Sequence, residues 1–522
     1  MGHRPGTADY LLHGGVPTDV AVVDGAARHT YADLRLAAGR TASALAALDL
    51  PPGSRVGILG PNSVFWVAAY LAVLKLGHVA VPLPDRATAA AVRRAADLAG
   101  CAVVCADRRA LRAAGSELDG GPALLTDDVV TAGPDPCWPD GAPPDPAADA
   151  VLMFTSGTTS RPRAVRITHR NLQANTESVL AYLRLRPDDR ILAVLPFHYC
   201  FGASLLHTHL RAGARLVLCT SLAFPRTVVD LLEREGCTGF AGVPSTFQLL
   251  LRAGTLATRP LPSLRLVQAA GGALPAVVVD ELRAAQPQAQ LFVMYGQTEA
   301  TARLSYLPPD RLQDKRGSIG RGIPGVELTV RHPSGRPVVP GEQGEIYARG
   351  ENVSPGYLDD PGATADKFTA HGLRTGDLAV VDEDGFVYVV DRADDFIKSW
   401  GHRVSSQEVE ACALRLPDLV QAAAVGVPDA AAGEAIALFV TRHPSSAVTG
   451  ADVLAFCGRH LPRHMVPRSV TVVDALPLTA SGKVAKAQLR AGALASAPAS
   501  GAASPSAGVT ASPSDGVTAG VT

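Results

Sequence analysis

The feature that most restricts the fold is an alternation of short apolar runs with longer amphipathic stretches between about residue 20 and residue 390. The apolar runs have the length of buried strands, and the stretches between them have helical periodicity. This alternation favours an α/β fold with mostly parallel sheets covered by helices. The expected strands are 55–59, 78–82, 150–154, 164–168, 190–195, 215–219, 238–243, 264–269 and 290–294, and the clearest helices are 62–76 and 202–211.

The pattern changes toward the C-terminus. Short strands separated by turns predict a small antiparallel subdomain over about 320–391, inside an N-terminal domain of residues 1–391. Residues 395–490 are predicted to form a compact α+β domain. The remainder, 491–522, contains only Ala, Ser, Gly, Pro, Val and Thr apart from Leu494 and Asp515, and we expect a disordered tail. In the α+β domain we expect helices 406–414, 451–460 and 484–490 and strands 420–427, 435–441 and 469–473.

Composition excludes several classes of protein. The net charge of -1 and an aromatic content of 5% argue against nucleic acid and anionic membranes as partners. The eight cysteines form no CxxC pair and lie mostly in apolar runs, which indicates reduced thiols without structural disulfides or zinc. The N-terminus lacks a signal core, and no apolar run reaches the roughly 18 residues that span a bilayer. We therefore expect a cytoplasmic protein.

Lysine is rare, with six residues against 42 arginines. The general preference for Ala, Arg, Gly and Pro is typical of mutational bias in the coding DNA rather than of a physical demand. A lysine that persists in such a chain therefore has a raised chance of a specific role. By the same argument, an arginine where a lysine is expected need not indicate lost function.

The segment Thr155 to Arg163 contains hydroxyl side chains, one glycine and two arginines directly after an expected strand. Hydroxyl and backbone N–H donors together with guanidinium charge suit a polyphosphate. Gly157 permits close approach of the backbone to a ligand, and Pro162 stiffens the exit. A solvated Ser/Thr turn between two strands is the alternative interpretation. The segment is not a Walker loop, because no Gly-Lys-Ser/Thr follows and the next segment is a strand.

Two further motifs follow expected strands. Tyr295-Gly-Gln-Thr-Glu299 comes after a buried strand, at the edge where open α/β sheets bind ligands. There a threonine hydroxyl can bind a phosphate oxygen, and a carboxylate can hold Mg²⁺. Arg374-Thr-Gly-Asp-Leu378 is predicted to be a turn whose buried Asp377 accepts two ribose hydroxyls. An ordinary strand-end turn and an ordinary Asp turn are the alternatives.

Two more motifs lie in the C-terminal part. The charged segment 391–403, which continues to Glu410, joins the two large parts and is alternatively only a solvated linker. Leu476-Pro-Leu-Thr-Ala-Ser-Gly-Lys483 is a loop that ends in one of the rare lysines, or alternatively a helix start with an exposed lysine. Each motif alone is weak evidence for a function. The order and spacing of the motifs along one chain are much more specific evidence.

Together the motifs over about residues 20–490 resemble the adenylate-forming (AMP-binding) superfamily: acyl- and aryl-CoA ligases, free-standing adenylation enzymes and luciferase. The resemblance implies a large N-terminal adenylation domain, a hinge at 392–394 and a small mobile C-terminal domain. It implies ATP, Mg²⁺ and CoA, or the phosphopantetheine of a carrier protein, as cofactors. The implied phosphate-binding residues are Thr155, Ser156, Gly157, Thr158, Thr159 and Arg163.

The same resemblance assigns the remaining site residues. Tyr295 is expected near adenine, Thr298 near the α-phosphate and Glu299 on Mg²⁺. Lys483 is expected to bridge the substrate carboxylate and the α-phosphate. The other implied residues are Gly271 and Gly272 along the adenine and acyl pockets, Asp377 and Arg392 on the ribose, Asp394 at the hinge, and Gly401 in the tunnel for the incoming thiol.

The chain departs from the family pattern in the hydroxyl-rich loop. The family usually has glycine at 160, lysine at 163 and glycine at 164, where this chain has Ser160, Arg163 and Ala164. The first and third changes remove backbone freedom, and the second replaces an ammonium with a guanidinium. Given the scarcity of lysine, Arg163 is most simply a change that preserves charge. Altered handling of ATP is the other interpretation.

The segment Leu195-Pro-Phe-His-Tyr-Cys-Phe-Gly202 resembles the border of the family's acyl pocket. Amino-acid-activating members usually have an aspartate where this chain has His198, which makes an α-amino acid a poor candidate. His198 matches the residue that CoA ligases place beside the carboxylate, or else is a structural histidine. Phe197, Tyr199 and Phe201 indicate an aryl or medium-chain apolar acid, or simply a core.

Three functions remain open from the sequence. The first is an ATP-dependent acyl- or aryl-CoA ligase. The second is the same activation with transfer to an acyl carrier protein or to an amine. The third is a nucleotide-binding protein without turnover, which the changes at 160, 163 and 164 make conceivable but which Glu299, Asp377 and Lys483 argue against.

Overall fold

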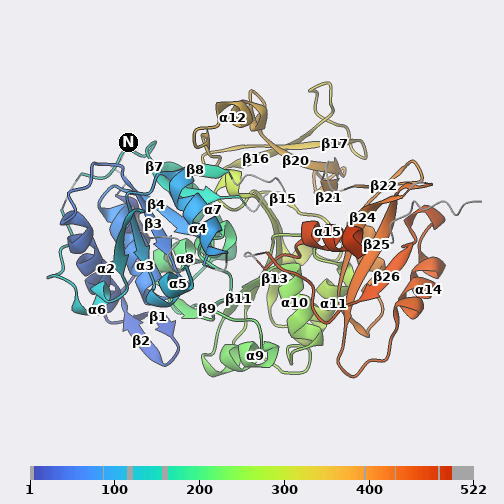
Figure 1. Cartoon of the computed structure of the whole chain (residues 1–522), viewed down its shortest axis with the longest axis horizontal. Coiled ribbons are helices and arrows are strands. Elements are labelled where there is room, and N and C mark those ends of the chain that lie inside the picture. The colour runs from blue at the N-terminus through green and yellow to red at the C-terminus, as the bar shows by residue number, and fades with distance from the viewer. Residues whose placement is uncertain are drawn as a thin grey trace, which may run out of the picture.

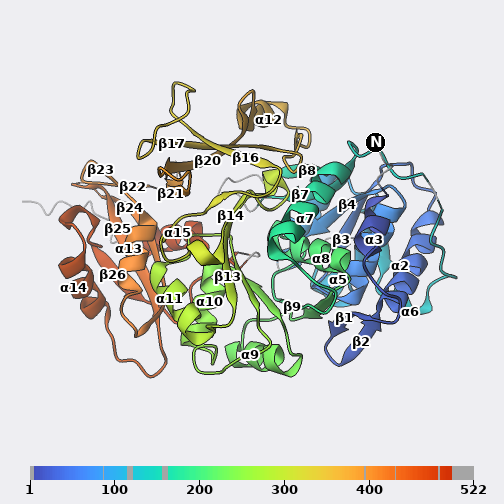
Figure 2. The same cartoon turned by 180° about the vertical axis from the view of Figure 1, so that it is seen from behind.

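The computed structural model describes residues 5–85, 87–114, 121–140, 142–155, 163–392, 396–429, 431–479 and 482–496. In Figure 1 the blue and green N-terminal elements fill one side and the centre, and the orange and red C-terminal elements lie at the opposite end. The ochre elements between them in sequence lie above both, as the reverse view in Figure 2 also shows.

Two large sheets form the N-terminal part, and both are mostly parallel as the alternation predicts. The nine-stranded sheet has the order β15-β14-β13-β12-β11-β9-β10-β1-β2, with antiparallel strands at its two ends. Its strands are β1 (Val20–Asp24), β2 (Ala27–Thr30), β9 (Arg190–Ala193), β10 (Arg215–Leu218), β11 (Gly239–Gly242), β12 (Leu266–Ala269), β13 (Gln290–Tyr295), β14 (Ser305–Leu307) and β15 (Arg321–Gly322).

The second large sheet has seven strands in the order β18-β8-β7-β4-β3-β5-β6. Its centre is parallel, whereas β8 and β18 are antiparallel to their neighbours. Its strands are β3 (Arg55–Leu59), β4 (Val79–Leu83), β5 (Val103–Ala106), β6 (Ala123–Thr126), β7 (Asp149–Phe154), β8 (Ala164–Thr168) and β18 (Gly356–Tyr357). The pairing of β7 with β8 confirms that a strand, and not a helix, follows the hydroxyl-rich loop.

Helices cover these sheets, and their ends follow local capping. The helix predicted over 62–76 is α3 (Val64–Lys75), which begins later because the Ser63 side chain accepts a hydrogen bond from the Trp66 N–H. The other helices here are α1 (Thr7–Leu12), α2 (Tyr31–Ala46), α4 (Ala89–Ala99), α5 (Arg108–Ala114), α6 (Val129–Ala132), α7 (His169–Leu183), α8 (Cys200–Ala212), α9 (Pro225–Arg234), α10 (Pro244–Arg252) and α11 (Ala276–Ala285).

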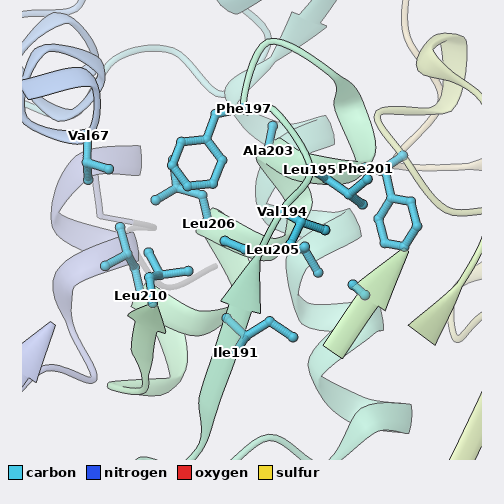
Figure 3. Close-up of a cluster of buried hydrophobic side chains, with 14 of the residues drawn as sticks. Val67, Ile191, Val194, Leu195, Phe197, Phe201, Ala203, Leu205, Leu206 and Leu210 are labelled. Carbon is cyan, nitrogen blue, oxygen red and sulfur yellow. The ribbon is translucent and has the colours of Figure 1, made fainter. Parts of the chain in front are cut away.

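Helices α3 and α8 are buried because each packs on one of the large sheets and both join the same core. Helix α3 packs on β3 and β4, and α8 packs on β9 and β10. Figure 3 shows Val67 of α3, Ile191 of β9 and Leu206 and Leu210 of α8 gathered in one apolar cluster. This packing fixes α8, whose N-terminus follows the segment 195–199.

One polar pair lies inside the same core. The Tyr70 hydroxyl of α3 lies 2.8 Å from Nε2 of His207 on α8, and burial lowers the pKa of His207 to about 3. The histidine is therefore neutral at pH 7 and can hydrogen-bond without the cost of a buried charge.

The antiparallel subdomain predicted over about 320–391 is confirmed. Its sheet has the order β16-β17-β20-β19, with β21 also paired to β20. The expected turn at 374–378 is wrong, because these residues lie inside β20, where Thr375 and Asp377 alternate as buried positions. Gly376, at φ +84°, and two register shifts supply the irregularity that resembles a turn in sequence. The elements are β16 (Val326–Arg331), β17 (Gln343–Gly350), α12 (Pro361–Lys367), β19 (Phe368–Thr369), β20 (Gly372–Val381) and β21 (Val387–Arg392).

The small C-terminal domain is α+β as expected, with sheet order β23-β22-β25-β24 and β26 parallel to β25. Its last helix continues to Ser496, so the expected start of a disordered tail at 491 is wrong; the alanines and leucine of 491–495 sustain the helix. Residues 497–522 lie outside the described residues. The elements are β22 (Ile397–Ser399), β23 (His402–Val404), α13 (Ser406–Ala413), β24 (Leu419–Asp429), β25 (Gly433–Arg442), α14 (Gly450–His460), β26 (Ser469–Val472) and α15 (Lys486–Ser496).

All eight cysteines carry free thiols. Within the described ranges, no helix combines the length and apolarity needed to cross a bilayer.

Replacing Gly202 of α8 with alanine is expected to destabilise the protein. A Cβ at this position would lie 2.0 Å from the carbonyl oxygen of Pro196 and 2.8 Å from that of Leu195, and backbone atoms cannot rotate away. We expect a loss of about 3 kcal/mol, the upper end for an overpacked site, seen in calorimetry as a lower unfolding temperature.

The matched control is Gly458→Ala in α14. No atom lies within 4 Å of a Cβ at this exposed helical position. Alanine is the better helix former, so the control should raise the stability of the C-terminal domain by about 1 kcal/mol. A Gly202→Ala protein that unfolds at the wild-type temperature would refute the close backbone approach.

Candidate functional site

Tyr295 and Asp377 join two sheets at the edge where β13 ends. The Tyr295 hydroxyl donates to Oδ2 of Asp377 at 2.5 Å, and Asp377 is 4% exposed. Glycine is required next to Tyr295, because a Cβ on Gly296 would lie 1.9 Å from the carbonyl oxygen of Ala302. Both residues are among those predicted from the sequence, and the structure brings them together.

Glu299 lies in the short 3-10 helix η2 (Thr298–Ala300), with a side chain that is almost fully buried. The hydroxyl of Tyr357, the last residue of β18, donates to its Oε1 at 2.7 Å. Burial, reinforced by the adjacent carboxylate, raises the pKa of Tyr357, so the phenol remains a proton donor at neutral pH. The phenol thus fixes the position of one carboxylate oxygen.

Arg163 lies at the exit of the hydroxyl-rich loop. Its Nε is 3.1 Å from Oδ2 of Asp360, and its guanidinium carbon is 5.6 Å from the centre of the Tyr357 ring. The Thr155 N–H donates to the carbonyl of Arg163 at 3.0 Å. This hydrogen bond joins the first and last residues of the loop. Ser156, Gly157, Thr158 and Thr159 lie outside the described residues.

Lys483 comes from the C-terminal domain and enters the N-terminal site. Its Nζ lies 5.5 Å from the centre of the Tyr199 ring. A Cβ on Gly271 would lie 3.2 Å from Cε of Lys483 and 2.9 Å from the Tyr199 hydroxyl. Gly271 adopts φ +89°, so both its backbone and the lysine stem favour glycine there. Gly272 is exposed, and a Cβ on it would lie 3.5 Å from Cγ of Pro244.

The loop that carries Lys483 is held at both of its described ends. The Thr479 N–H donates to the carbonyl of Lys483 at 2.7 Å, and Leu478 forms a bridge with Val484. The Ser245 hydroxyl of α10 donates to the carbonyl of Gly482, also at 2.7 Å. The N-terminal domain thus contacts the residue directly before the lysine.

Cys200 links Thr298 to the Lys483 region. The Thr298 hydroxyl lies 3.5 Å from the Cys200 sulfur, and Cys200 follows Tyr199. Burial raises the pKa of the Cys200 thiol, whereas Thr298 and the ammonium of Lys483 oppose the shift.

His198 pairs with an acidic residue that sequence reasoning missed. Nδ1 of His198 lies 3.5 Å from Oδ1 of Asp85, and the two side chains are 8% and 13% exposed. The available signal was the position of Asp85, which only Pro84 separates from the end of buried strand β4 at the carboxyl edge of a parallel sheet. Tyr357 and Asp360 were also missed, and nothing in their local pattern marked them.

The remaining expected residues lie apart from Lys483 or outside the described side chains. The backbone of Arg392 pairs with Asp377, but its side chain and Asp394 are not described. Gly401 lies in the exposed turn between β22 and β23 at φ +76°, and a Cβ there would have no neighbour within 4 Å. In this arrangement Gly401 lies apart from the site residues that the structure describes.

The donor set fits a magnesium ion that is shared with a phosphate. Among the described residues no group of three His, Cys, Asp or Glu side chains could enclose a metal. Glu299 instead offers a single, oriented carboxylate. Mg²⁺ typically takes one or two carboxylates, substrate phosphates and water rather than an all-protein cage.

Comparison with known proteins gives the family. The family model described as AMP-binding enzyme matches residues 14–358, and that of the AMP-binding enzyme C-terminal domain matches residues 408–483. A feruloyl-CoA synthase of Amycolatopsis sp is 33% identical over 493 residues, which cover 91% of this chain and 96% of that protein.

Solved structures agree over almost the whole chain. ATP-bound MatB from Rhodopseudomonas palustris has a TM-score of 0.82 at 28% identity, and the match covers 93% of this chain and 98% of that chain. The apo crystal structure of MatB has a TM-score of 0.71 with the same identity and coverage. The o-succinylbenzoate CoA synthetase of Bacillus subtilis, with its acyl-adenylate intermediate OSB-AMP, has a TM-score of 0.83 at 27% identity and covers 94% of this chain and 99% of its own.

The raised pKa of Cys200 predicts slow alkylation. The thiolate is the reactive form, so at pH 8 iodoacetamide should modify buried Cys200 at least ~10-fold more slowly than exposed Cys137. Because the folded-state pKa is raised, labelling of Cys200 should grow as the pH rises toward 9.5. Timed alkylation followed by peptide mass spectrometry measures both rates. Equal rates at pH 8 would contradict the buried thiol cluster.

Proposed function

The chain belongs to the AMP-binding enzyme family and is an AMP-forming CoA ligase, and we propose that it activates a carboxylic acid with ATP to an acyl-AMP. Pyrophosphate leaves in this first step, and the thiol of CoA then displaces AMP to give the thioester. The observation that carries the proposal is the entry of Lys483 from the C-terminal domain between Tyr199 and Gly271 of the N-terminal domain.

The first step must overcome repulsion between a carboxylate and the anionic phosphates. The acid is already ionised at pH 7, so no general base is needed. In our proposal Lys483 bridges the acid carboxylate and the α-phosphate and stabilises the charge of the in-line transition state. Arg163 adds positive charge at the exit of the phosphate loop. Mg²⁺ held by Glu299 supplies further charge neutralisation when bound.

The nucleoside part is assigned to the other side of the site. We assign the ribose to Asp377 and Arg392 and the neighbourhood of adenine to Tyr295. The 2.5 Å bond from Tyr295 to Asp377 supports a shared role, because it aligns the carboxylate that accepts the ribose hydroxyls. The Thr298 hydroxyl is assigned to the α-phosphate. Thr155 and residues 156–159 complete the phosphate loop in this proposal.

The second step requires a different arrangement of the C-terminal domain. Lys483 occupies the site, whereas Gly401 lies in an exposed turn, where an added Cβ would meet no described atom within 4 Å. We propose that the domain rotates about a hinge at Asp394, which withdraws Lys483 and brings the Gly401 turn to the thiol tunnel. The absence of a side chain at Gly401 leaves room there for a pantetheine arm.

The acid is proposed to be aryl or apolar and of medium size. His198 and Tyr199 border the proposed acyl pocket, and relatives include a feruloyl-CoA synthase, whereas Phe197 and Phe201 are buried in the core. His198 is assigned a place beside the substrate carboxylate. Asp85 supports a functional orientation of this ring, because its Oδ1 lies 3.5 Å from Nδ1 of His198 and both side chains are largely buried.

A panel of acids tests the proposed function. Pyrophosphate release is measured with ATP, Mg²⁺ and, in turn, ferulate, benzoate, octanoate, malonate and glycine. We expect release with an aryl or apolar acid and none with glycine. CoA, a phosphopantetheinylated carrier protein or an amine is then added to the active acid, and mass spectrometry identifies the product. Release with none of the acids would favour a nucleotide-binding protein without turnover.

Lys483→Ala is expected to reduce acyl-AMP formation at least ~10²-fold, the low end for loss of one positioned electrostatic group. Transfer from chemically prepared acyl-AMP to CoA should be largely spared, because the lysine acts in the first step alone. The control is Lys315→Ala, which removes an ammonium that pairs with Asp382 at 2.8 Å in the antiparallel subdomain. Equal losses in both half-reactions of Lys483→Ala would contradict the assigned role.

A further inference from the structure

Helix α10 of the N-terminal domain contacts the C-terminal domain at both of its ends. Near its N-terminus, Ser245 donates to the carbonyl of Gly482, the residue before Lys483. The carbonyl of Ser245 in turn accepts a weak hydrogen bond from the Gln421 side chain at 3.4 Å. At its C-terminus, Arg252 reaches the body of the same domain. One rigid element therefore holds both the lysine loop and the domain that carries it.

The Arg252 contacts are the more extensive. Its Nη1 donates to the carbonyl of Leu419 at 2.6 Å, and its Nη2 donates to the carbonyl of Leu414 at 3.0 Å. Leu414 caps the C-terminal end of α13, where helix carbonyls lack internal donors and the helix dipole is negative. A guanidinium from another domain thus satisfies this helix end, while the Arg252 side chain is only 8% exposed.

The charge of Arg252 is compensated within the N-terminal domain. Its Nη2 and Nε lie 2.6 and 3.2 Å from the two carboxylate oxygens of Glu281 on α11. Both members of this pair belong to the N-terminal domain, so the pair does not depend on groups of the C-terminal domain. Undocking therefore exposes two carbonyls to water but leaves no buried charge without a partner, a combination that suits a contact made and broken in every cycle.

Apolar packing accompanies these hydrogen bonds. Val277 of α11 packs against the apolar core of the C-terminal domain, whose members include Leu414 and Leu419. Helix α10 itself contacts β24. The docked face thus combines an apolar contact, a bidentate arginine and the serine at the lysine loop.

We propose that Arg252 is a positioning residue that docks the C-terminal domain on α10 and thereby holds Lys483 in the site for acyl-AMP formation. This inference rests on the proposed function for its kinetic consequences. It concerns Arg252, Glu281 and Ser245, none of which belongs to the motifs that identify the family in the sequence. Loss of the dock should slow the first half-reaction selectively, because the second requires Lys483 to leave.

The kinetic test uses Arg252→Gln, Arg252→Lys and Ser245→Ala in the full chain. With the acid that gives the fastest pyrophosphate release in the panel, Arg252→Gln should reduce acyl-AMP formation 10- to 100-fold. Transfer from prepared acyl-AMP to CoA should remain within about twofold of wild type. Arg252→Lys should be intermediate, because one ammonium cannot span Glu281 and two carbonyls. Ser245→Ala should show the same selective loss, but smaller.

The structural test needs no acid. Hydrogen–deuterium exchange is measured with ATP and Mg²⁺ present, and Arg252→Gln should accelerate exchange in peptides that cover 244–252 and 476–485. The matched control is Arg316→Ala, which removes an arginine whose hydrogen bonds, among the described residues, go to Asp280 of α11 at 2.9 Å. Arg316→Ala should change neither exchange at the dock nor the ratio of the two half-reactions.

Two outcomes would overturn the proposal. One is Arg252→Gln with unchanged exchange and unchanged half-reactions; the other is an equal loss in both half-reactions with a lower unfolding temperature, which indicates a purely structural residue. If the wild-type protein releases pyrophosphate with none of the acids in the panel, the proposed function fails. The exchange result still decides whether Arg252 docks the domain.

Discussion

The geometry of the site depends on one contact, the entry of Lys483 between Tyr199 and Gly271. A lysine from one domain can act on chemistry in another only if both domains are held at a fixed distance. Gly271 leaves space for the lysine stem, and the Tyr199 ring accepts the ammonium on its face. The two large sheets matter functionally because their shared core fixes α8, and with it Tyr199, relative to the end of β13.

Much of the architecture could be predicted because strand and helix periods are local properties. The parallel sheets, the antiparallel subdomain and the α+β domain all follow from runs of a few residues. The partners of the site residues are not local. Tyr357 is 58 residues from Glu299, and Asp360 is 197 residues from Arg163. Both partners depend on the pairing of the two-residue strand β18 with β8, which no periodicity can specify.

The misplaced turn at 374–378 and the missed Asp85 have opposite causes. At 374–378, Gly376 and the neighbouring polar residues are typical of a turn, but the long-range pairing of β20 with β17 and β21 overrides this preference. Asp85 was missed because no sequence motif surrounds it, although it lies just after a strand. Its significance emerges only when β4 of one sheet and the segment before α8 meet at His198.

The scarcity of lysine separates positions that need an ammonium from those that need only charge. Lys75, Lys315 and Lys486 all form ion pairs with carboxylates, a role that arginine can also fill. Arg163 stands where the family has lysine, half-exposed beside Asp360 and over the face of Tyr357, a setting in which a planar guanidinium stacks well. Lys483 differs, because Tyr199 and Gly271 enclose its stem closely. A guanidinium is wider than an ammonium, so this is the position where the arginine bias of the chain cannot operate without loss of fit.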